Sequence, residues 1–391
     1  MKIIYYSQHI WGVGHVFRTL EISKALTGHE VVLVTGGDRV DAPMPDHVRE
    51  FRLPVIMTDR NPKDLVATDN EMSLEQTHQK RKQMLRDIYV DESPDVLMVE
   101  FYPFGRNAFR FELDPLLESI RNRELPESFV VSSLRDILVE KVDIHLYEPR
   151  VIRKLNRFFD ALLVHADPVL VKLDETFGRM DEIDIPVAYT GFVAPRPEAG
   201  AGPGLRKMLG IKDAEKLIVV SSGGGKAGAP LVEAVLKAFP RLGIYDCCHL
   251  YIFTGPYMSE EDFERVYRYS DKRIKISRFT TDFLSYLAAA DLSVSMGGYN
   301  TCMNLLTSGV TALVWPFSYD REQGIRARRL ARRGVLRVLE DTDLGPEKLA
   351  DLMEKALTEK NGSVARIDLE GAAHTADWLM KHAVKFKVPK I

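Results

Sequence analysis

The sequence predicts an α/β protein made of two Rossmann-like domains, each with a parallel β-sheet. Along the 391 residues, short runs rich in Val, Ile and Tyr alternate with longer stretches of helical period, which is the pattern of βαβ units. Both halves also open alike, with a strand, a glycine-rich turn and a helix: Ile3–Tyr6 precedes Gly12–His15, and Leu217–Ser221 precedes Gly223–Lys226. Ligands of open α/β sheets bind beyond the carboxyl ends of the strands, so we expect two domains that face each other across a cleft.

A stretch of Pro, Gly and Ala at residues 194–204 divides the chain. A segment of this composition buries little apolar surface and forms few backbone hydrogen bonds, so we expect a surface linker there. This gives an N-terminal domain of residues 1–193 and a C-terminal domain of residues 205–391. Whether the last helix packs back on the N-terminal domain stays open.

The individual elements follow from local composition and period. Strands are expected in the first half at Lys2–Tyr6, Glu30–Val34, Asp95–Val99, Phe129–Ser132 and Ala161–His165. In the second half they are expected at Leu217–Ser221, Leu250–Phe253, Ile274–Ile276, Leu292–Ser295, Ala312–Trp315 and Val335–Leu339. Apolar residues at helical spacing predict amphipathic helices between the strands, such as His15–Leu26 and Leu74–Ile88.

Composition excludes several classes of protein. With 45% hydrophobic residues the chain is not disordered, and 53 Lys and Arg against 56 Asp and Glu leave a net charge of −3, so specific nucleic-acid binding is not expected. Cys247, Cys248 and Cys302 cannot form a disulfide framework and favour a reduced compartment. No residue spacing suggests a metal site, and neither a signal peptide nor a membrane span is expected, which favours a cytoplasmic protein.

The first candidate ligand site is the glycine loop after Leu217–Ser221. Without side chains, Gly223–Gly225 let a phosphate approach the backbone N–H groups, and a helix expected to begin near Ala227 adds its positive end. Lys226 can add a point charge. The pattern is neither GxGxxG nor GxxxxGK[ST], which disfavours a dinucleotide oxidoreductase and a P-loop NTPase. A tight turn that needs glycine only for its geometry is the structural alternative.

A second glycine motif, Gly297–Thr301, again joins a strand to a helix. Two such helix N-termini can flank a diphosphate, although Asn300 and Thr301 could simply cap the helix. Farther on, Glu322 and Gln323 precede a basic helix expected at residues 324–333 and offer paired donors and acceptors for sugar hydroxyls. The structural alternative is that the acidic residues complement the helix dipole, while the helix arginines, Arg326 among them, form a solvated face.

The third motif is the N-terminal loop Gly12-Val-Gly-His-Val-Phe-Arg18. Gly12 and Gly14 permit an abrupt turn from strand to helix, and His15 stands in the first turn. There the positive end of the helix dipole disfavours the imidazolium form, so a neutral ring could accept a proton as a catalytic base. A structural histidine is the alternative.

Two further clusters have plain structural explanations. Asp341 and Asp343 could bind a metal, but capping of the following helix is the favoured interpretation. The aromatic residues of 101–111, interleaved with Arg106 and Arg110, could contact a hydrophobic acceptor or a membrane, whereas packing after the preceding strand is the simpler explanation.

Taken together, these motifs resemble the GT-B nucleotide-sugar glycosyltransferases, and within them the MurG-like group. The marks of the resemblance are the N-terminal glycine loop, the central glycine loop, Gly297-Gly-Tyr-Asn-Thr301, Arg321-Glu-Gln323 and Ser133-Leu-Arg-Asp-Ile137. The resemblance implies a GT-B fold, an acceptor-binding N-terminal domain, a donor-binding C-terminal domain, and inverting transfer without an essential metal. It implies a loop for acceptor or phosphate at Gly12, Gly14 and Arg18, with His15 as the catalytic residue. It also implies donor binding by Ser222, Gly223, Gly224, Gly225, Lys226, Phe279, Thr280, Gly297, Gly298, Tyr299, Asn300, Thr301, Asn304, Glu322 and Gln323.

Two departures from the family pattern bear on the substrate. MurG proteins have a ribose-binding glutamate where this chain has Asn304, and this departure leaves the nucleotide open. A UDP-sugar is still favoured over GDP- and dTDP-sugars. The loop reads GVGH instead of GxGGH and also resembles that of a UDP-sugar hydrolase, in which water is the acceptor. We therefore expect a glycosyltransferase of the hexosyl or N-acetylhexosaminyl class, with a nucleotide-sugar hydrolase and a non-catalytic donor-binding subunit as alternatives. A nucleotide sugar is the only co-substrate expected, and no cofactor is expected. The acceptor can be a small molecule, a glycan or a lipid-linked sugar. Peripheral contact of the protein with the inner face of the membrane stays open.

Overall fold

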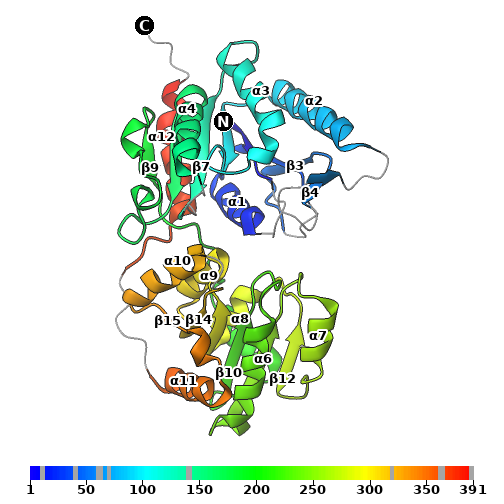
Figure 1. Ribbon diagram of the computed structural model, residues 1–391, viewed down its shortest axis with the longest axis vertical. Helices are drawn as coiled ribbons and strands as arrows, with labels where there is room; N and C mark the ends of the chain where they lie inside the picture. Colours follow the sequence, from blue (N-terminus) through cyan, green and yellow to red (C-terminus); the bar gives the residue numbers. More distant parts are fainter. Residues whose placement is uncertain are drawn as a thin grey trace. The chain divides into compact units, whose positions relative to one another are not determined.

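The computed structural model describes residues 1–8, 14–37, 43–58, 65–67, 72–137, 143–317, 321–359 and 366–386. The chain forms two compact units (Figure 1). The first comprises Met1–Val193 together with Asp368–Ile391, and the second comprises Ala194–Ile367. Each unit is an α/β structure around one parallel sheet, as the alternation of strand and helix patterns predicts.

The sheet of the first unit has seven strands in the order β3-β2-β1-β6-β7-β8-β9, and every pair in it is parallel. The strands are β1 (Lys2–Tyr6), β2 (Glu30–Thr35), β3 (Val48–Arg52), β6 (Val96–Glu100), β7 (Phe129–Arg135), β8 (Ala161–His165) and β9 (Val187–Tyr189). A separate antiparallel hairpin joins β4 (Ile56–Thr58) and β5 (Leu65–Ala67). The central strands are buried on both faces, which explains their continuous apolar sequences.

Helices pack on both faces of this sheet. The helices are α1 (Gly14–Ala25), α2 (Leu74–Glu92), α3 (Arg110–Arg121), α4 (Ile144–Phe158) and α12 (Gly371–Phe386). On one face, α1 and α12 share a core with alternate residues of the strands, where Leu20 and Leu379 are almost fully buried. On the other face, the Tyr6 hydroxyl contacts Glu112 of α3, whose carboxylate also pairs with the fully buried Arg81 of α2 at 2.6 Å.

The second unit repeats the pattern with six parallel strands in the order β12-β11-β10-β13-β14-β15. They are β10 (Lys216–Ser221), β11 (Cys248–Phe253), β12 (Ile274–Ser277), β13 (Leu292–Met296), β14 (Ala312–Trp315) and β15 (Arg337–Val338). Its helices are α5 (Ala201–Leu209), α6 (Ala229–Ala238), α7 (Glu260–Tyr267), α8 (Phe283–Ala289), α9 (Tyr299–Ser308), α10 (Arg321–Arg332) and α11 (Pro346–Thr358). Short 3₁₀ turns occur at Asn107–Phe109, Leu173–Glu175, Met180–Glu182, Phe239–Arg241, Tyr245–Cys247 and Asp341–Asp343.

The structure differs from the sequence prediction at several element boundaries. The helix after the first glycine motif begins at Ala229 and not near Ala227, and the basic helix begins at Arg321, so it already contains Glu322 and Gln323. Helix α5 begins at Ala201, inside the stretch expected to be linker. A methyl group at Gly202 would lie 2.4 Å from the Ala288 carbonyl oxygen, so the glycine-rich composition here serves close helix packing.

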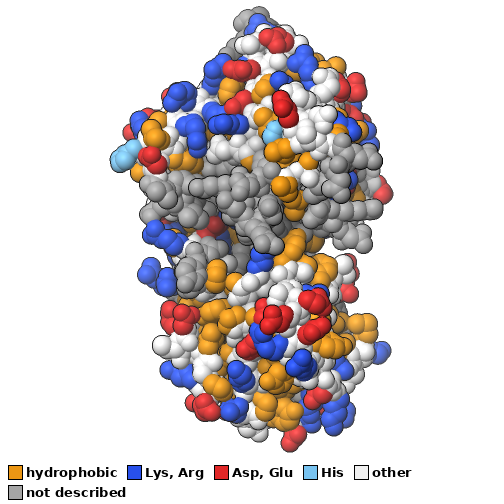
Figure 2. Space-filling model, turned by 45° about the vertical axis from the view of Figure 1, so that its right-hand side comes forward, with side chains coloured by type: hydrophobic (Ala, Val, Ile, Leu, Met, Phe, Trp, Pro, Cys, Tyr) orange, Lys and Arg blue, Asp and Glu red, His pale blue; other side chains and the backbone are white. Residues whose placement is uncertain are grey.

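Charged side chains of both signs are mixed over the visible face of the second unit in Figure 2, in keeping with the balanced composition. Within the described ranges, no helix is both long enough and apolar enough to cross a bilayer.

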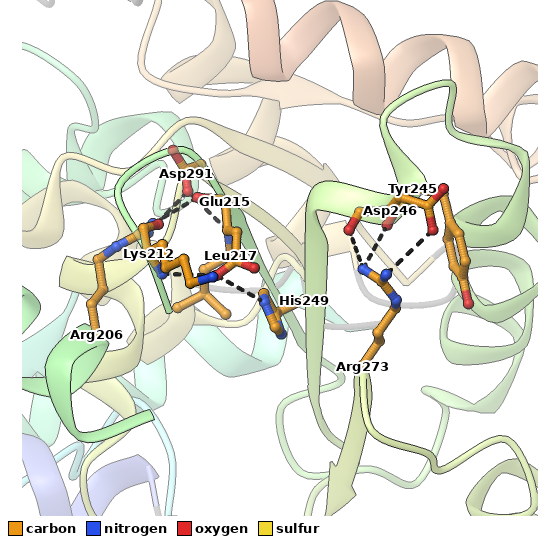
Figure 3. A network of polar contacts seen from close by, with 9 residues as sticks. All are labelled: Arg206, Lys212, Glu215, Leu217, Tyr245, Asp246, His249, Arg273 and Asp291. Carbon is orange, nitrogen blue, oxygen red and sulfur yellow. Dashed lines mark hydrogen bonds and ion pairs between the residues drawn. The ribbon is translucent and has the colours of Figure 1, made fainter. Parts of the chain in front are cut away.

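A polar network holds α5 against the amino-terminal edge of the second sheet (Figure 3). Asp291, just before β13, accepts the Leu217 backbone N–H at 2.9 Å and pairs with Lys216 at 2.9 Å and Arg206 at 3.1 Å. The Arg206 guanidinium also donates to the carbonyl oxygens of residues 212, 215 and 289. Because ligands of such sheets bind at the opposite edge, this network serves stability.

Replacing Asp291 by alanine should lower the free energy of unfolding of the second unit by about 2–3 kcal/mol, because the change leaves two cations and a backbone amide without their acceptor. Urea denaturation measures the loss. Asp213→Ala, at an exposed aspartate shortly before β10 in the same unit, is the matched control and should change little. An Asp291→Ala protein as stable as this control would contradict the stabilising role.

Candidate functional site

Both sheets have a point at which the direction of strand addition reverses. In the first unit β1 lies between β2 and β6, and in the second unit β10 lies between β11 and β13. Loops that leave the carboxyl ends of two such neighbouring strands diverge and leave a crevice, which is where open α/β sheets bind ligands. The predicted motifs fall at these points: the N-terminal loop follows β1, and the two glycine motifs of the second half follow the adjacent strands β10 and β13.

The loop after β10 requires its glycines. Gly223 and Gly225 have φ values of 63° and 98°, and a methyl group at Gly225 would lie 2.5 Å from the Thr254 carbonyl oxygen. The Gly223 amide donates to Ser221 Oγ at 3.2 Å and the Gly225 amide to the Ser222 carbonyl at 3.2 Å. Of the three described glycine amides, that of Gly224 is therefore the one that makes no hydrogen bond within the loop.

Helices α6 and α9 both begin without a capping side chain, because their N-cap residues are Gly228 and Gly298. The first amides of a helix lack partners within the helix and carry its partial positive charge. The two uncapped N-termini, on neighbouring strand ends, therefore offer amide donors to an anion. On α9, Tyr299 and Thr301 are buried, while Asn300 is half-buried.

The beginning of α10 lies next to the second glycine motif. A methyl group at Gly297 would lie 3.5 Å from Gln323 Cβ, and the Gln323 side-chain oxygen accepts the Phe317 amide at 3.2 Å. Glu322 is buried and its carboxylate lies 3.2 Å from the buried guanidinium of Arg326. Arg326 also lies over the Tyr299 ring, 5.2 Å from its centroid. The interpretation of Arg326 as part of a solvated face is therefore wrong. The buried Arg326 side chain connects α10 to α9 through its contact with the Tyr299 ring.

The remaining predicted donor residues lie around the same edge. Phe279 is 51% exposed and follows β12, which lies two strands away from β10 in the sheet. The hydroxyl of the neighbouring Thr280 accepts the Asp282 amide at 3.1 Å. Asn304 lies on α9 with its side-chain oxygen buried and without a hydrogen-bond partner. Lys226 is exposed, while Ser222 is buried and donates its hydroxyl to the Thr254 carbonyl.

In the first unit, His15 pairs with a carboxylate that the sequence analysis did not single out. His15 is the second residue of α1, and its Nδ1 lies 2.6 Å from Oε1 of Glu100, the last residue of β6. Arg18 Nη2 lies 3.2 Å from the same Nδ1, but the shorter contact is to a carboxylate, which only accepts. We therefore assign the proton to Nδ1, which leaves Nε2 as the basic nitrogen. Arg18, one turn along α1, contacts the same carboxylate oxygen. The Thr19 hydroxyl bonds the His15 carbonyl at 2.9 Å and the Ser7 hydroxyl at 2.9 Å, which fixes the first turn of α1 to the end of β1.

The environment of the pair keeps the imidazole neutral. Burial lowers the pKa of His15 to about 3, and the positive charges of Arg106 and Arg18 act in the same direction, although Glu100 opposes them. Burial alone would raise the pKa of Glu100, but His15 and the arginines outweigh it and hold that pKa well below its usual range. His15 is therefore neutral and Glu100 ionised at neutral pH, as a proton acceptor and its orienting partner require.

Other predicted features have simple outcomes. Gly12 lies outside the described residues, whereas Gly14 is the first residue of α1. The aromatic residues Tyr102, Phe104 and Phe109 are fully buried, so packing is the correct explanation for them. The predicted capping of the following helix by Asp341 and Asp343 is wrong, because α11 begins after Gly345 without a side-chain cap. Asp341 instead accepts from Trp315 Nε1 at 2.8 Å, and Asp343 accepts the Glu340 amide at 3.0 Å within the 3₁₀ turn. Among the described residues, no three His, Cys, Asp or Glu side chains are placed to hold a metal ion.

Two histidines of the first unit, His15 and His165, have strongly lowered pKa values and predict a stability that falls with acid. His165, at the end of β8, has a pKa lowered by burial to about 3, as has His15. Unfolded histidine titrates near 6.5, so between about pH 6.5 and pH 3 the unfolded state binds one more proton per histidine. The free energy of unfolding should therefore decrease by about 1.4 kcal/mol per pH unit for each of them as the pH falls through this range.

Urea denaturation of the first unit between pH 7.5 and 5 tests this expectation. His165 is hydrogen-bonded to Ser133 at 2.7 Å and to Thr190 at 2.8 Å, and a glutamine can keep such bonds without titrating. His165→Gln should therefore remove about 1.4 kcal/mol per pH unit from the slope. Equal slopes in the two proteins would show that His165 is not held neutral.

Comparison with known proteins agrees with this arrangement. Residues 218–377, which contain both glycine motifs of the second unit, match the family model of the glycosyltransferase family 28 C-terminal domain. An uncharacterized glycosyltransferase of Methanopyrus kandleri is 23% identical over 233 residues, which cover 59% of this chain and 64% of that protein. The UDP-N-acetylglucosamine–N-acetylmuramyl-(pentapeptide) pyrophosphoryl-undecaprenol N-acetylglucosamine transferase of Carboxydothermus hydrogenoformans is 26% identical over 242 residues, or 56% of this chain and 63% of the relative. The similarity thus spans less than two thirds of the length of these relatives.

Solved structures match over nearly the whole chain. MurG of Acinetobacter baumannii superimposes with a TM-score of 0.57 at 17% identity and covers 97% of this chain and 100% of its own. The glycosyltransferase VinC, solved in complex with dTDP, superimposes with a TM-score of 0.58 at 15% identity. The match covers 98% of this chain and 96% of the VinC chain. The resemblance expected from the sequence motifs is confirmed. The chain has the GT-B fold of these solved structures, and its residues 218–377 match the glycosyltransferase family 28 C-terminal domain.

Proposed function

We propose that this protein is a glycosyltransferase that moves a sugar from a nucleoside-diphosphate donor to an acceptor hydroxyl. The observation that carries the proposal is the pair of His15 and Glu100, a neutral imidazole oriented by a buried carboxylate at the carboxyl edge of the first sheet. The uncapped helices α6 and α9 support donor binding by the second unit, which leaves the acceptor to the first. A UDP-sugar is the favoured donor, because the relatives whose names state a donor use UDP-N-acetylglucosamine.

In the proposed reaction, Nε2 of His15 takes the proton of the acceptor hydroxyl while the hydroxyl oxygen attacks the anomeric carbon of the donor sugar. The bond between that carbon and the diphosphate oxygen breaks, and the electron pair stays on the diphosphate. Because attack comes from the face opposite the leaving group, one displacement inverts the anomeric centre. The Gly224 amide and the N-termini of α6 and α9 would stabilise the charge that develops on the diphosphate, a task that needs no bound metal.

The sugar of the donor is assigned to the residues at the beginning of α10. Gln323 lies beside Gly297, and the neighbouring Glu322 is held by Arg326, which also contacts the Tyr299 ring. Asn304 has a buried side-chain oxygen without a partner, and we assign it to a ribose hydroxyl, which can donate to that oxygen. Phe279, half of whose surface is exposed, and Thr280 are assigned to the base.

Thermal-shift measurements with UDP, GDP and dTDP test the donor assignment. A nucleotide at 100 times its dissociation constant should stabilise the protein by about 2.7 kcal/mol. Gly224→Val should lose this response, since its side chain would cover the Gly224 amide; the protein should still fold because the nearest atom, on Tyr257, lies 3.7 Å from a Cβ at this position. Gly345→Val, at an exposed glycine with open space around it, is the matched control. No response to any of the three nucleotides would contradict the proposal.

A hydrolase is the second candidate, because the same base can activate water and the Gly12–Arg18 loop also resembles that of a UDP-sugar hydrolase. Incubation with nucleotide sugars alone, and then with a pooled extract of candidate acceptors, separates the two. A transferase should release nucleoside diphosphate without releasing an equal amount of free sugar. This release should persist in excess chelator, because the proposed reaction needs no bound metal. Stoichiometric free sugar without any acceptor would establish hydrolysis.

A further inference from the structure

One carboxylate oxygen of Glu100 is buried without a hydrogen bond. Oε1 contacts both His15 and Arg18, whereas Oε2 is inaccessible to solvent and none of the described residues donates to it. Buried polar atoms in folded proteins are almost always paired, and a buried carboxylate that lacks donors takes up a proton more readily. A donor dipole directed at Oε2 would therefore help Glu100 to stay ionised.

A row of buried polar side chains crosses the sheet beside Glu100. The register of β6 and β7 sets Ser133 opposite Glu100, and strand alternation places Tyr5, Ser133 and His165 on the face that α1 and α12 cover. The Tyr5 hydroxyl lies 3.0 Å from Ser133 Oγ, and this oxygen lies 2.7 Å from His165 Nε2. All three residues are fully buried, so they form one hydrogen-bonded chain inside the first unit.

The outer end of the chain lies at Thr190. His165 Nδ1 lies 2.8 Å from Thr190 Oγ1 and 3.4 Å from Thr375 Oγ1 of α12. The Thr375 hydroxyl donates to the Gly371 carbonyl at 2.6 Å, so its hydrogen is committed elsewhere. The nearer Thr190 hydroxyl is therefore the main partner of Nδ1.

The charges of the His15 site act on both ends of this chain. The pKa of Tyr5 is raised to about 12, mainly by burial and next by the charge of Glu100, while Arg18 opposes the rise. The pKa of His165 is lowered to about 3, mainly by burial and next by Arg18, while Glu100 opposes the fall. At neutral pH, Tyr5 therefore keeps its hydroxyl hydrogen and His165 is a neutral ring with a single N–H.

The position of that N–H sets the direction of the whole chain. With the proton on Nε2, His165 donates to Ser133 and Ser133 donates to Tyr5, which leaves the Tyr5 hydrogen available for Glu100. Nδ1 then accepts from the Thr190 hydroxyl. With the proton on Nδ1, Tyr5 donates to Ser133 and Ser133 donates to Nε2, and Glu100 Oε2 stays unpaired. The first direction is the one that brings a donor to the buried oxygen.

We propose that Tyr5, Ser133 and His165 are positioning residues for Glu100, with the His165 proton on Nε2 and the Tyr5 O–H dipole directed at Glu100 Oε2. The inference rests on the proposed function and adds a support to its base. When His15 takes up the acceptor proton, the imidazolium and Glu100 become a buried ion pair. A donor dipole at Oε2 lowers the proton affinity of the carboxylate, so the proton stays on His15 and the ion pair persists.

NMR of protein labelled with nitrogen-15 histidine reads the tautomer of His165 without any acceptor. Two-bond correlations from the ring carbon-bound protons distinguish a protonated ring nitrogen from an unprotonated one. The His165→Gln protein identifies the His165 signals by their absence. We expect the Nε2–H tautomer at neutral pH, and the Nδ1–H tautomer would overturn the inference.

Tyr5→Phe removes only the hydroxyl at the Glu100 end of the chain. With UDP-N-acetylglucosamine saturating and the pooled acceptor extract present, the rate of UDP release should fall by about tenfold, because a dipole that stabilises a charged group is lost. The UDP-induced thermal shift should stay unchanged. Tyr89→Phe is the matched control and should keep the rate, because Tyr89 is equally buried and its hydroxyl also contacts a serine, Ser128, at 2.7 Å. Equal rates of Tyr5→Phe and the wild type would overturn the inference.

The double variant Tyr5→Phe with Glu100→Gln separates positioning from a general loss of structure. Glu100→Gln already removes the charge that the hydroxyl serves, so adding Tyr5→Phe should lower the rate no further. A further loss as large as that of Tyr5→Phe alone would show that Tyr5 acts through the fold and would overturn the inference. A wild type that releases no UDP would contradict the proposed function alone, and the tautomer of His165 would then decide the inference.

Discussion

Replacing His15 by alanine should lower kcat by about 10²–10⁴-fold, because the acceptor hydroxyl would then lose its general base. Nucleotide affinity should stay unchanged, since His15 belongs to the first unit and the assigned donor residues belong to the second. Initial-rate kinetics with the donor saturating, together with the nucleotide thermal shift, separate the two quantities.

The control is His145→Ala, which removes an exposed histidine of α4 in the same unit and should leave kcat unaffected. A His15→Ala enzyme with near-normal kcat would assign the base role to another residue. If both kcat and nucleotide affinity fell, His15 would instead be acting through the fold.

Glu100→Gln should lower kcat by roughly 10²–10⁴-fold, even though it changes only one atom of the side chain. The carboxylate of Glu100 accepts from His15 Nδ1 at 2.6 Å and so leaves Nε2 unprotonated. A glutamine can donate to Nδ1, and the proton then resides on Nε2, where the ring cannot accept another from the acceptor. The neutral side chain also no longer stabilises the imidazolium that forms during transfer.

Glu118→Gln is the matched control, because Glu118 is an exposed glutamate of the same unit that pairs with Arg157. The double variant His15→Ala with Glu100→Gln should be no slower than His15→Ala alone, since the two residues act as one unit. Additive losses would contradict the pairing and would indicate that Glu100 acts on the substrate by another route.

The parts of the structure that were predictable from the sequence depend on local patterns. The apolar runs identified the central strands, such as Lys2–Tyr6 and Ala161–His165, with their observed boundaries. The edge strands of the first sheet were missed, whereas β12 and β15 at the edges of the second sheet were predicted. The sequence of β3, VREFR, has only two apolar residues, and β9 has only three residues, VAY, so neither gives a clear strand pattern.

The site was predictable only where its chemistry is local. The glycine loops and His15 could be recognised because turn geometry requires glycine and the histidine adjoins it. Glu100 is 85 residues from His15 and becomes its partner only because β6 pairs with β1. One signal was present: an acidic residue closes the otherwise apolar strand VLMVE, at the edge where ligands bind. The buried contacts of Arg326 likewise depend on the packing of α9 against α10, which the basic sequence of α10 conceals.

The position of α12 has a consequence for biosynthesis. This helix belongs to the first unit, where Leu379 and Ala383 complete the core beside α1, but the ribosome makes it after the whole of the second unit. The second unit is continuous in sequence and can fold as soon as it has emerged. The first unit must wait with the α1 face of its sheet incompletely covered until α12 is released. That apolar face therefore stays incompletely covered while residues 194–367 are made, and exposed apolar surface of this kind is prone to aggregation.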